Sequence, residues 1–252
     1  MKVTINRAKM FTDSDYVKFL KTISDTTKTY LFKDFSWKTP GLLLRHDVDL
    51  SIDFCLRLVE KEAKANVVST NFIMATSPLY NPNSHENTKN LREISELGSE
   101  IALHFDPTCY PKASEDELLS HAKNEATILE NIIGQKVCSI SLHCPSIHGQ
   151  FPIFENFVNA YDPSFFTDEN YISDSCMSFR GKDPIEWVYL SKIKPIQMLL
   201  HPLHYQTNTQ NYCSIFECLI NKHFQVVNDL FSISPPFARD IGKLNKYSIE
   251  KD

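Results

Sequence analysis

Acidic and imidazole side chains stand at the ends of four apolar runs in this sequence. Each run is short enough for a β-strand, and each ends on residues that can bind a metal ion or transfer a proton. In chain order these residues are Asp47, Asp49, His104, Asp106, His143, His201 and His204. In a parallel (β/α) barrel the carboxyl ends of the strands open at one mouth, where active sites lie. We therefore expect these side chains to converge on one site.

The donor types predict a transition-metal site. Carboxylate oxygen together with imidazole nitrogen suits Zn²⁺, Fe²⁺, Co²⁺ or Mn²⁺, whereas Ca²⁺ and Mg²⁺ prefer oxygen ligands. A catalytic site of this kind uses about three protein ligands. A bound ion lowers the pKa of water from about 15.7 towards roughly 7, which makes hydroxide available at neutral pH. The sequence thus indicates a divalent metal, with Zn²⁺ as the first choice, in a hydrolytic site.

Asp47 and Asp49 lie two positions apart, so both side chains point to the same face of an extended strand end. One of them can bind the metal while the other takes a proton from water. Structural alternatives stay open at two positions. Asp49 could cap the helix that begins near Ser51, and Asp106, which precedes Pro107, could be an ordinary turn residue.

The segments between these residues alternate as in a parallel α/β fold. Apolar runs predict strands, and segments of helical period predict helices. The expected strands are 41–47, 67–74, 100–106, 136–143 and 194–205, and the expected helices are 51–66, 85–98, 113–134 and 210–231. Prolines interrupt the pattern from 144 to about 194. We predict an α/β fold, a distorted (β/α) barrel of about seven strands. Residues 1–252 form a single domain in this prediction, with 1–40 as an N-terminal extension packed on it.

Composition excludes several classes of protein. The apolar fraction of 42% supports a substantial core and argues against disorder. A net charge of -5 offers no basic surface for phosphate contacts, so we expect no nucleic-acid partner. No apolar stretch approaches the length of a membrane span, and the N-terminus has no signal-like apolar run. The seven cysteines are an odd set without a Cys-x-x-Cys pair, which predicts reduced thiols in a cytoplasmic protein.

The motifs resemble those of the polysaccharide deacetylase family, the NodB-homology carbohydrate esterases, over about residues 42–205. Members of that family fold as distorted (β/α) barrels and use a divalent metal, commonly zinc, to remove acetyl groups from N-acetylated sugars. "HDVD" is similar to the Asp-x-Asp form of the first family motif. This resemblance implies that Asp47 is the catalytic base and Asp49 a metal ligand.

The second family motif is similar to "GSEIALHFDP", which puts His104 in the position of the first histidine ligand. The family has a second histidine four residues further on, where this chain has Thr108. The third metal ligand must therefore come from elsewhere, or the metal must be held weakly. His143, Asp106 and His201 are the candidates, and we take His143.

The third motif of the family, Arg-x-Pro, is similar to "HCPS", which keeps Pro145 but has no arginine. The resemblance implies that His143 or Arg45 takes over the positioning of the catalytic aspartate. "YISDS" and "LLHPLHY" are similar to the fourth and fifth motifs, which implies that Asp174 orients His201, the general acid.

Together with the strand-end residues, this resemblance implies a metal-dependent hydrolase that removes an N-acetyl or similar N-acyl group from an amino sugar or a sugar-containing glycan precursor. Two alternatives stay open. One is a hydrolase of another linear amide in surface-glycan biosynthesis, and the other is a non-catalytic carbohydrate-binding relative of the barrel.

Overall fold

The computed structural model describes residues 11–206 and 211–240 of the 252-residue chain. Contacts between Cα atoms divide the chain into two compact units, Met1–Thr207 and Asn208–Asp252, and each is described by itself. The prediction of one domain over 1–252 stays a prediction. Of the predicted N-terminal extension, residues 1–10 lie outside the described residues.

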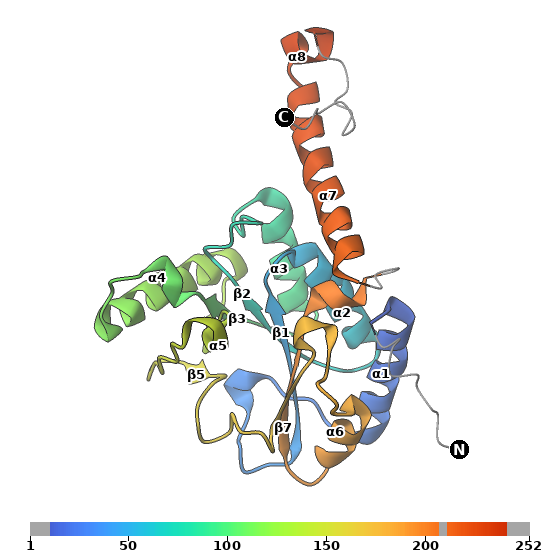
Figure 1. Cartoon of the computed structure of the whole chain (residues 1–252), viewed down its shortest axis with the longest axis vertical. Helices are drawn as coiled ribbons and strands as arrows, with labels where there is room; N and C mark the ends of the chain where they lie inside the picture. The colour runs from blue at the N-terminus through green and yellow to red at the C-terminus, as the bar shows by residue number, and fades with distance from the viewer. Residues whose placement is uncertain (1–10, 207–210, 241–252) are drawn as a thin grey trace. The chain divides into compact units, whose positions relative to one another are not determined.

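Seven parallel strands form the sheet of the first unit. They are β1 Gly41–Val48, β2 Thr70–Ile73, β3 Glu100–Phe105, β4 Ser139–Leu142, β5 Val158–Asn159, β6 Tyr171–Ser173 and β7 Pro195–Leu200. They pair in the order β5-β4-β3-β2-β1-β7-β6, every pair being parallel, so β1 stands inside the sheet and β5 and β6 form its edges (Figure 1). The sheet is curled into a half-barrel. The predicted α/β fold class is confirmed.

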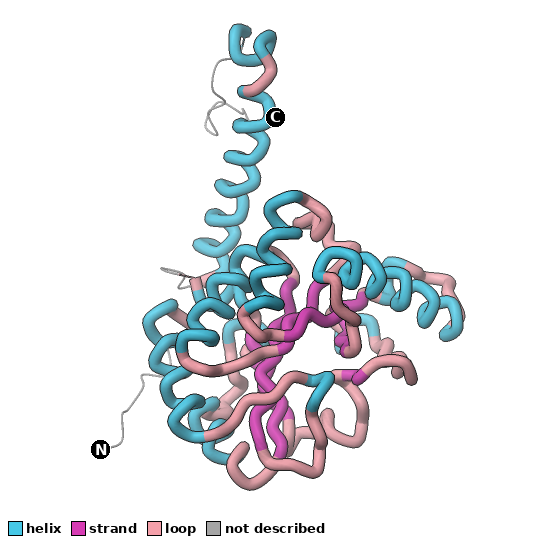
Figure 2. The backbone as a smooth tube through the Cα atoms, turned by 180° about the vertical axis from the view of Figure 1, so that it is seen from behind, coloured by secondary structure: helices cyan, strands magenta, loops and turns pink. Residues whose placement is uncertain are grey.

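Helices follow the strands along the outside of this sheet. The first unit contains α1 Asp13–Thr26, α2 Ile52–Lys64, α3 His85–Glu96, α4 Glu115–Ile133, α5 Pro145–His148 and α6 Pro184–Leu190, with 3₁₀ turns η1 Phe32–Asp34, η2 Pro107–Cys109, η3 Ser175–Met177 and η4 Pro202–Tyr205. Neighbouring helices touch in the order α4, α3, α2, α1, α6, which parallels the order of their strands. Figure 2 shows the strands in the middle of this unit with helices beside them.

The second unit contains α7 Tyr212–Ser232 and α8 Pro235–Asp240. The predicted helix at 210–231 corresponds to α7. Within the described parts of the chain, no helix combines the length and the apolarity that crossing a bilayer requires.

Local sequence signals determine where the helices begin and end. Ser51 caps α2 by accepting a hydrogen bond from the backbone N–H of Phe54 at 3.4 Å. Ser114 and Glu117 form the predicted capping box of α4, and Gly134 ends that helix at a φ of +69°. The region 144–194, where the sequence predicted no elements, contains α5, α6 and the short edge strands β5 and β6.

The two faces of β1 have different neighbours, and this difference positions the site. Leu42 and Leu44 pack into the core formed with α1, α2 and α6, and His46 bonds to Glu62 of α2 at 2.6 Å. Side chains alternate along a strand. Arg45 and Asp47 therefore project to the opposite, inner side of the curled sheet, and Asp49 follows at its carboxyl end.

Candidate metal and catalytic site

Three potential metal donors meet at the carboxyl ends of β1, β3 and β4. Asp49 Oδ1 lies 3.1 Å from His104 Nε2 and 3.3 Å from His143 Nδ1. The two imidazole nitrogens are themselves 3.3 Å apart. One carboxylate oxygen and two imidazole nitrogens therefore form a nearly equilateral triangle.

This triangle fits a divalent cation. Bonds of about 2.0–2.1 Å to a tetrahedral ion place neighbouring ligand atoms roughly 3.3–3.4 Å apart, close to the observed 3.1–3.3 Å. Asp49 Oδ1 is buried and makes no hydrogen bond to the described residues, although two ring nitrogens lie beside it. A buried carboxylate oxygen without a hydrogen bond is costly unless an ion or water satisfies it. The donor set is also the one that zinc and its neighbours prefer.

Local contacts leave Asp49 available for this group. Ser51 accepts the capping hydrogen bond of α2. Asp49 is therefore not the N-cap of that helix. The hydroxyl of Tyr80 donates to the carbonyl oxygen of Val48 at 2.6 Å. This bond holds the end of β1, directly before Asp49, in place.

The three candidates for the third ligand position differ in where their side chains lie. Asp106 Oδ1 accepts hydrogen bonds from the N–H of Thr108 at 2.9 Å and from its hydroxyl at 2.6 Å, so this carboxylate closes its own turn. His201 Nε2 lies 3.9 Å from the other carboxylate oxygen of Asp49, Oδ2. His143 is the candidate that joins Asp49 and His104.

Backbone geometry fixes the end of β4 at His143. Its N–H donates to the carbonyl oxygen of Phe105 at 2.8 Å, which continues the pairing of β4 with β3. Its own carbonyl oxygen lies 2.7 Å from His148 Nε2, and Cys144 turns the chain with a φ of +46°. Non-glycine residues adopt this left-handed conformation only where the surroundings enforce it. The sharp turn ends the strand directly after the imidazole.

Arg45 holds the carboxylate of Asp47 in a two-pronged contact. Its Nε and Nη2 donate to the two oxygens of Asp47, both at 2.8 Å. Nη2 also contacts the Ser141 hydroxyl at 2.9 Å and the Tyr161 hydroxyl at 3.1 Å, and the guanidinium lies over the rings of Phe72 and Tyr161. The sequence left open whether His143 or Arg45 orients Asp47, and the observed contact is with Arg45.

Both members of this pair are buried, Arg45 completely and Asp47 with 4% of its surface exposed. Burial alone would raise the pKa of Asp47, but the adjacent Arg45 charge outweighs it and lowers that pKa below the usual range. Burial likewise opposes the charge of Arg45, and the Asp47 carboxylate raises the pKa of the guanidinium well above its ordinary value. The pair is therefore ionised at neutral pH.

Asp174, directly after β6, contacts two histidines that follow β7. Its Oδ1 lies 2.6 Å from His201 Nδ1, and its Oδ2 lies 2.9 Å from His204 Nδ1. Asp174 is fully buried, and the backbone N–H of His201 also donates to it. Burial opposes ionisation, yet the two imidazoles lower the pKa of Asp174 below its usual range. Burial also opposes the charged form of His201, but the Asp174 carboxylate raises the pKa of His201 to about 9.

The structure thus brings together every predicted site residue except Asp106, in two adjoining groups that face each other across the Asp49 carboxylate. Two contributors to the site, Ser141 and Tyr161, were not predicted from the sequence. A signal for Ser141 exists, because Ser139, Ser141 and His143 alternate along β4 and share its inner face. Tyr161 follows the short edge strand β5 and has no such signal.

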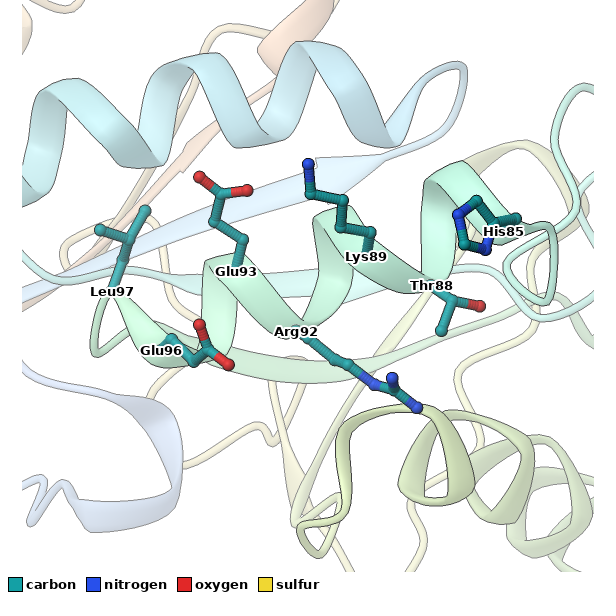
Figure 3. A pocket seen from close by; sticks show the side chains of 7 residues that line it. All are labelled: His85, Thr88, Lys89, Arg92, Glu93, Glu96 and Leu97. Atoms are coloured by element: carbon teal, nitrogen blue, oxygen red, sulfur yellow. The ribbon is translucent and has the colours of Figure 1, made fainter.

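A separate pocket lies along α3 (Figure 3). It is lined by His85, Thr88, Lys89, Arg92, Glu93, Glu96 and Leu97. These side chains have mixed charge, and none of them belongs to the group of aspartates and histidines. The chemistry of the site therefore does not involve this pocket.

No family model matches the chain. No curated protein matches it either. Comparison with solved structures finds distant likenesses to proteins of the CE4 family, which comprises polysaccharide deacetylases. The matched structures are of the same family that the sequence motifs resemble.

Three of these structures show how distant the likeness is. A CE4 family pseudoenzyme from Bacillus anthracis is 18% identical with a TM-score of 0.41, the match covering 74% of this chain and 61% of that one. The CE4 domain of a multidomain xylanase from the hindgut metagenome of Trinervitermes trinervoides is 17% identical with a TM-score of 0.43, covering 72% and 83%. A family 4 acetyl xylan esterase from Clostridium thermocellum in complex with a cobalt ion is 12% identical with a TM-score of 0.39, covering 76% and 90%. The chain spans less than two thirds of the length of the pseudoenzyme.

Proposed function

We propose that this chain is a metal-dependent hydrolase of the polysaccharide deacetylase type, which removes an N-acetyl or similar N-acyl group from an amino sugar or a glycan precursor. The observation that carries the proposal is the triangle of Asp49, His104 and His143 donors, 3.1–3.3 Å on a side, next to an ionised Asp47 and a cationic His201. These groups together provide metal ligands, a base and an acid in one place.

Asp49, His104 and His143 are the residues that would hold the ion. Zn²⁺ is the first choice for this donor set, and Fe²⁺, Co²⁺ or Mn²⁺ are alternatives. When bound, such an ion supplies Lewis acidity, which acidifies water and polarises an amide carbonyl.

Asp47 is the proposed general base. Its Oδ2 lies 3.8 Å from His104 Nε2, so the carboxylate is next to the ligand group. Arg45 keeps it ionised and fixes its orientation. A fixed carboxylate can accept a proton from the attacking water, and a positioned base of this kind contributes about 10²- to 10⁴-fold to the rate.

His201 is the proposed general acid. Its raised pKa, about 9, leaves it protonated at neutral pH. Asp174 holds Nδ1, so Nε2 is the nitrogen directed towards Asp49. From there it donates its proton to the departing amine nitrogen, and the products are a free amino sugar and the carboxylate of the acyl group.

Acetate release from purified, zinc- or cobalt-loaded protein tests the proposal. The substrates are N-acetylated sugars, nucleotide sugars and short N-acetylated oligosaccharides. Asp47→Asn should abolish turnover and leave metal content nearly unchanged, while Asp25→Asn, at an exposed surface carboxylate, should change neither. Loss of metal in Asp47→Asn would indicate that Asp47 is the metal ligand and Asp49 the base. Metal-loaded protein that hydrolyses none of these substrates contradicts the deacetylase assignment.

A non-catalytic, carbohydrate-binding relative is the second candidate. It is favoured by Thr108, which occupies the position where the resembled motif has a metal-binding histidine. Protein purified without chelators distinguishes the two, because a degenerate site should contain no metal. Hydrolysis of another linear amide would be detected by extending the substrate panel, and the cytoplasmic location stays a prediction.

A further inference from the structure

The hydroxyl of Ser141 lies between the proposed base and one of the proposed metal ligands. Ser141 is on β4 and 1% exposed. Its Oγ is 2.7 Å from His104 Nδ1, 2.9 Å from Arg45 Nη2 and 3.4 Å from Asp47 Oδ1. One small side chain therefore contacts a ligand, the base and the arginine that holds the base.

The chemistry of these three neighbours limits how the hydroxyl can be oriented. A serine hydroxyl donates one hydrogen bond and can accept two. The guanidinium of Arg45 can only donate, and the ionised Asp47 can only accept. Metal binding through Nε2 requires the His104 proton on Nδ1. The hydroxyl then accepts from Nδ1 and from Arg45, and its own proton points to Asp47 Oδ1.

The Ser141 hydroxyl thus supplies an acceptor for one tautomer of His104. With its proton on Nδ1, the imidazole keeps a lone pair on Nε2, the nitrogen that lies 3.1 Å from Asp49 Oδ1. Neutral imidazole with a free nitrogen is the form that binds metal, and the partner of the other nitrogen decides which one is free.

We propose that Ser141 is a positioning residue that presents His104 Nε2 to the metal and couples this ligand to the Arg45–Asp47 pair. The proposal rests on the proposed function of the site. Removal of the outer partner of a metal-binding histidine typically weakens metal affinity or activity about 10- to 100-fold. Ser141 is not itself among the proposed metal ligands, so its proposed role acts only through His104 and the Arg45–Asp47 pair.

Ser139 provides a matched control. It lies two residues earlier on the same inner face of β4 and is also fully buried. Its hydroxyl donates to Glu100 Oε1 at 2.6 Å, at the opposite end of the strands. Ser139→Ala and Ser141→Ala therefore remove the same atom from the same strand, at different distances from the site.

The test is Co²⁺ binding by the full chain, measured by chelator competition and by the visible absorption of the bound ion. Ser141→Ala should bind Co²⁺ about 10- to 100-fold more weakly with a changed spectrum, and Ser139→Ala should match the wild type in both. Ser141→Thr, which keeps the hydroxyl, should restore both readouts, and thermal melting confirms that each variant is folded.

Wild-type affinity and spectrum in Ser141→Ala would overturn the proposal while leaving the metal site intact, as would an equal loss in Ser139→Ala. A wild-type chain that binds no Co²⁺ would overturn the proposed function and the role of Ser141 with it. The two failures are therefore distinguishable.

Discussion

The pair of Arg45 and Asp47 allows a quantitative test through the stability of the fold. Both side chains are buried, with exposed fractions of 0% and 5%, and two N–H groups of the guanidinium donate at 2.8 Å. The perturbation is a double-mutant cycle of Arg45→Met, Asp47→Asn and the combined variant. Each single substitution leaves one buried charge without its partner, and the combined variant leaves none.

The expected energies follow from this geometry. At a separation of 2.8 Å, two unit charges attract by about 6 kcal/mol for an effective dielectric constant of about 20. Desolvation cancels part of that attraction, and removal of one partner of a buried pair typically destabilises a protein by about 3–5 kcal/mol. We expect each single variant to lose an amount in this range. The combined variant should lose less than their sum, by about 3 kcal/mol.

Urea unfolding of the four proteins, followed by circular dichroism, measures the coupling free energy. The control is the same cycle at Lys21 and Asp25, an i,i+4 pair with 77% and 63% exposed side chains, which should give a coupling of at most about 0.5 kcal/mol. Arg45→Lys keeps the charge but loses the two-pronged contact, so it should be less destabilising than Arg45→Met. Equal coupling free energies at the two pairs would show that burial does not strengthen the interaction between Arg45 and Asp47.

Two further outcomes are expected. Asp174→Asn should reduce acyl hydrolysis about 10²- to 10⁴-fold, because His201 loses the carboxylate that keeps it protonated, while metal content measured by mass spectrometry stays unchanged; loss of the metal would place Asp174 in the ligand group. Burial raises the pKa of Glu125 on α4 from 4.5 to about 7, so the folded chain prefers the protonated acid. Because the folded state binds more protons than the unfolded state between these pH values, stability falls as the pH rises through that window. Glu125→Gln should remove this fall and stabilise the protein at pH 8 by up to about 3 kcal/mol relative to its effect near pH 4. Thermal melts at both pH values check this, and a wild-type pH dependence in Glu125→Gln would contradict it.

Much of the site was predictable because parallel strands impose their geometry. Once β1, β3 and β4 are recognised from their apolar runs, their carboxyl ends must lie at one edge, and Asp49, His104 and His143 come together. The sequence could not decide between the candidates for the third ligand, because that choice depends on side-chain direction. In the structure Asp106 bonds to Thr108 within the turn 106–109, whereas His143 lies beside Asp49 and His104.

Other features had no readable signal. The edge strands β5 and β6 contain two and three residues, too few for a period of two to be recognised. Arg45 was one of two candidates for orienting Asp47, since a strand pattern shows which face a side chain lies on but not which partner it reaches. Ser141 is a small polar residue in a strand, and its role depends on contacts with residues 37 and 96 positions away.

Binding of one divalent cation by Asp49, His104 and His143 underlies the proposed function. A crystal structure of protein grown with Zn²⁺, with anomalous scattering recorded on both sides of the zinc absorption edge, tests it most directly. We expect one strong peak about 2.0–2.1 Å from Asp49 Oδ1, His104 Nε2 and His143 Nδ1. A peak held instead by Asp174, His201 and His204, or no peak at these donors, would contradict it.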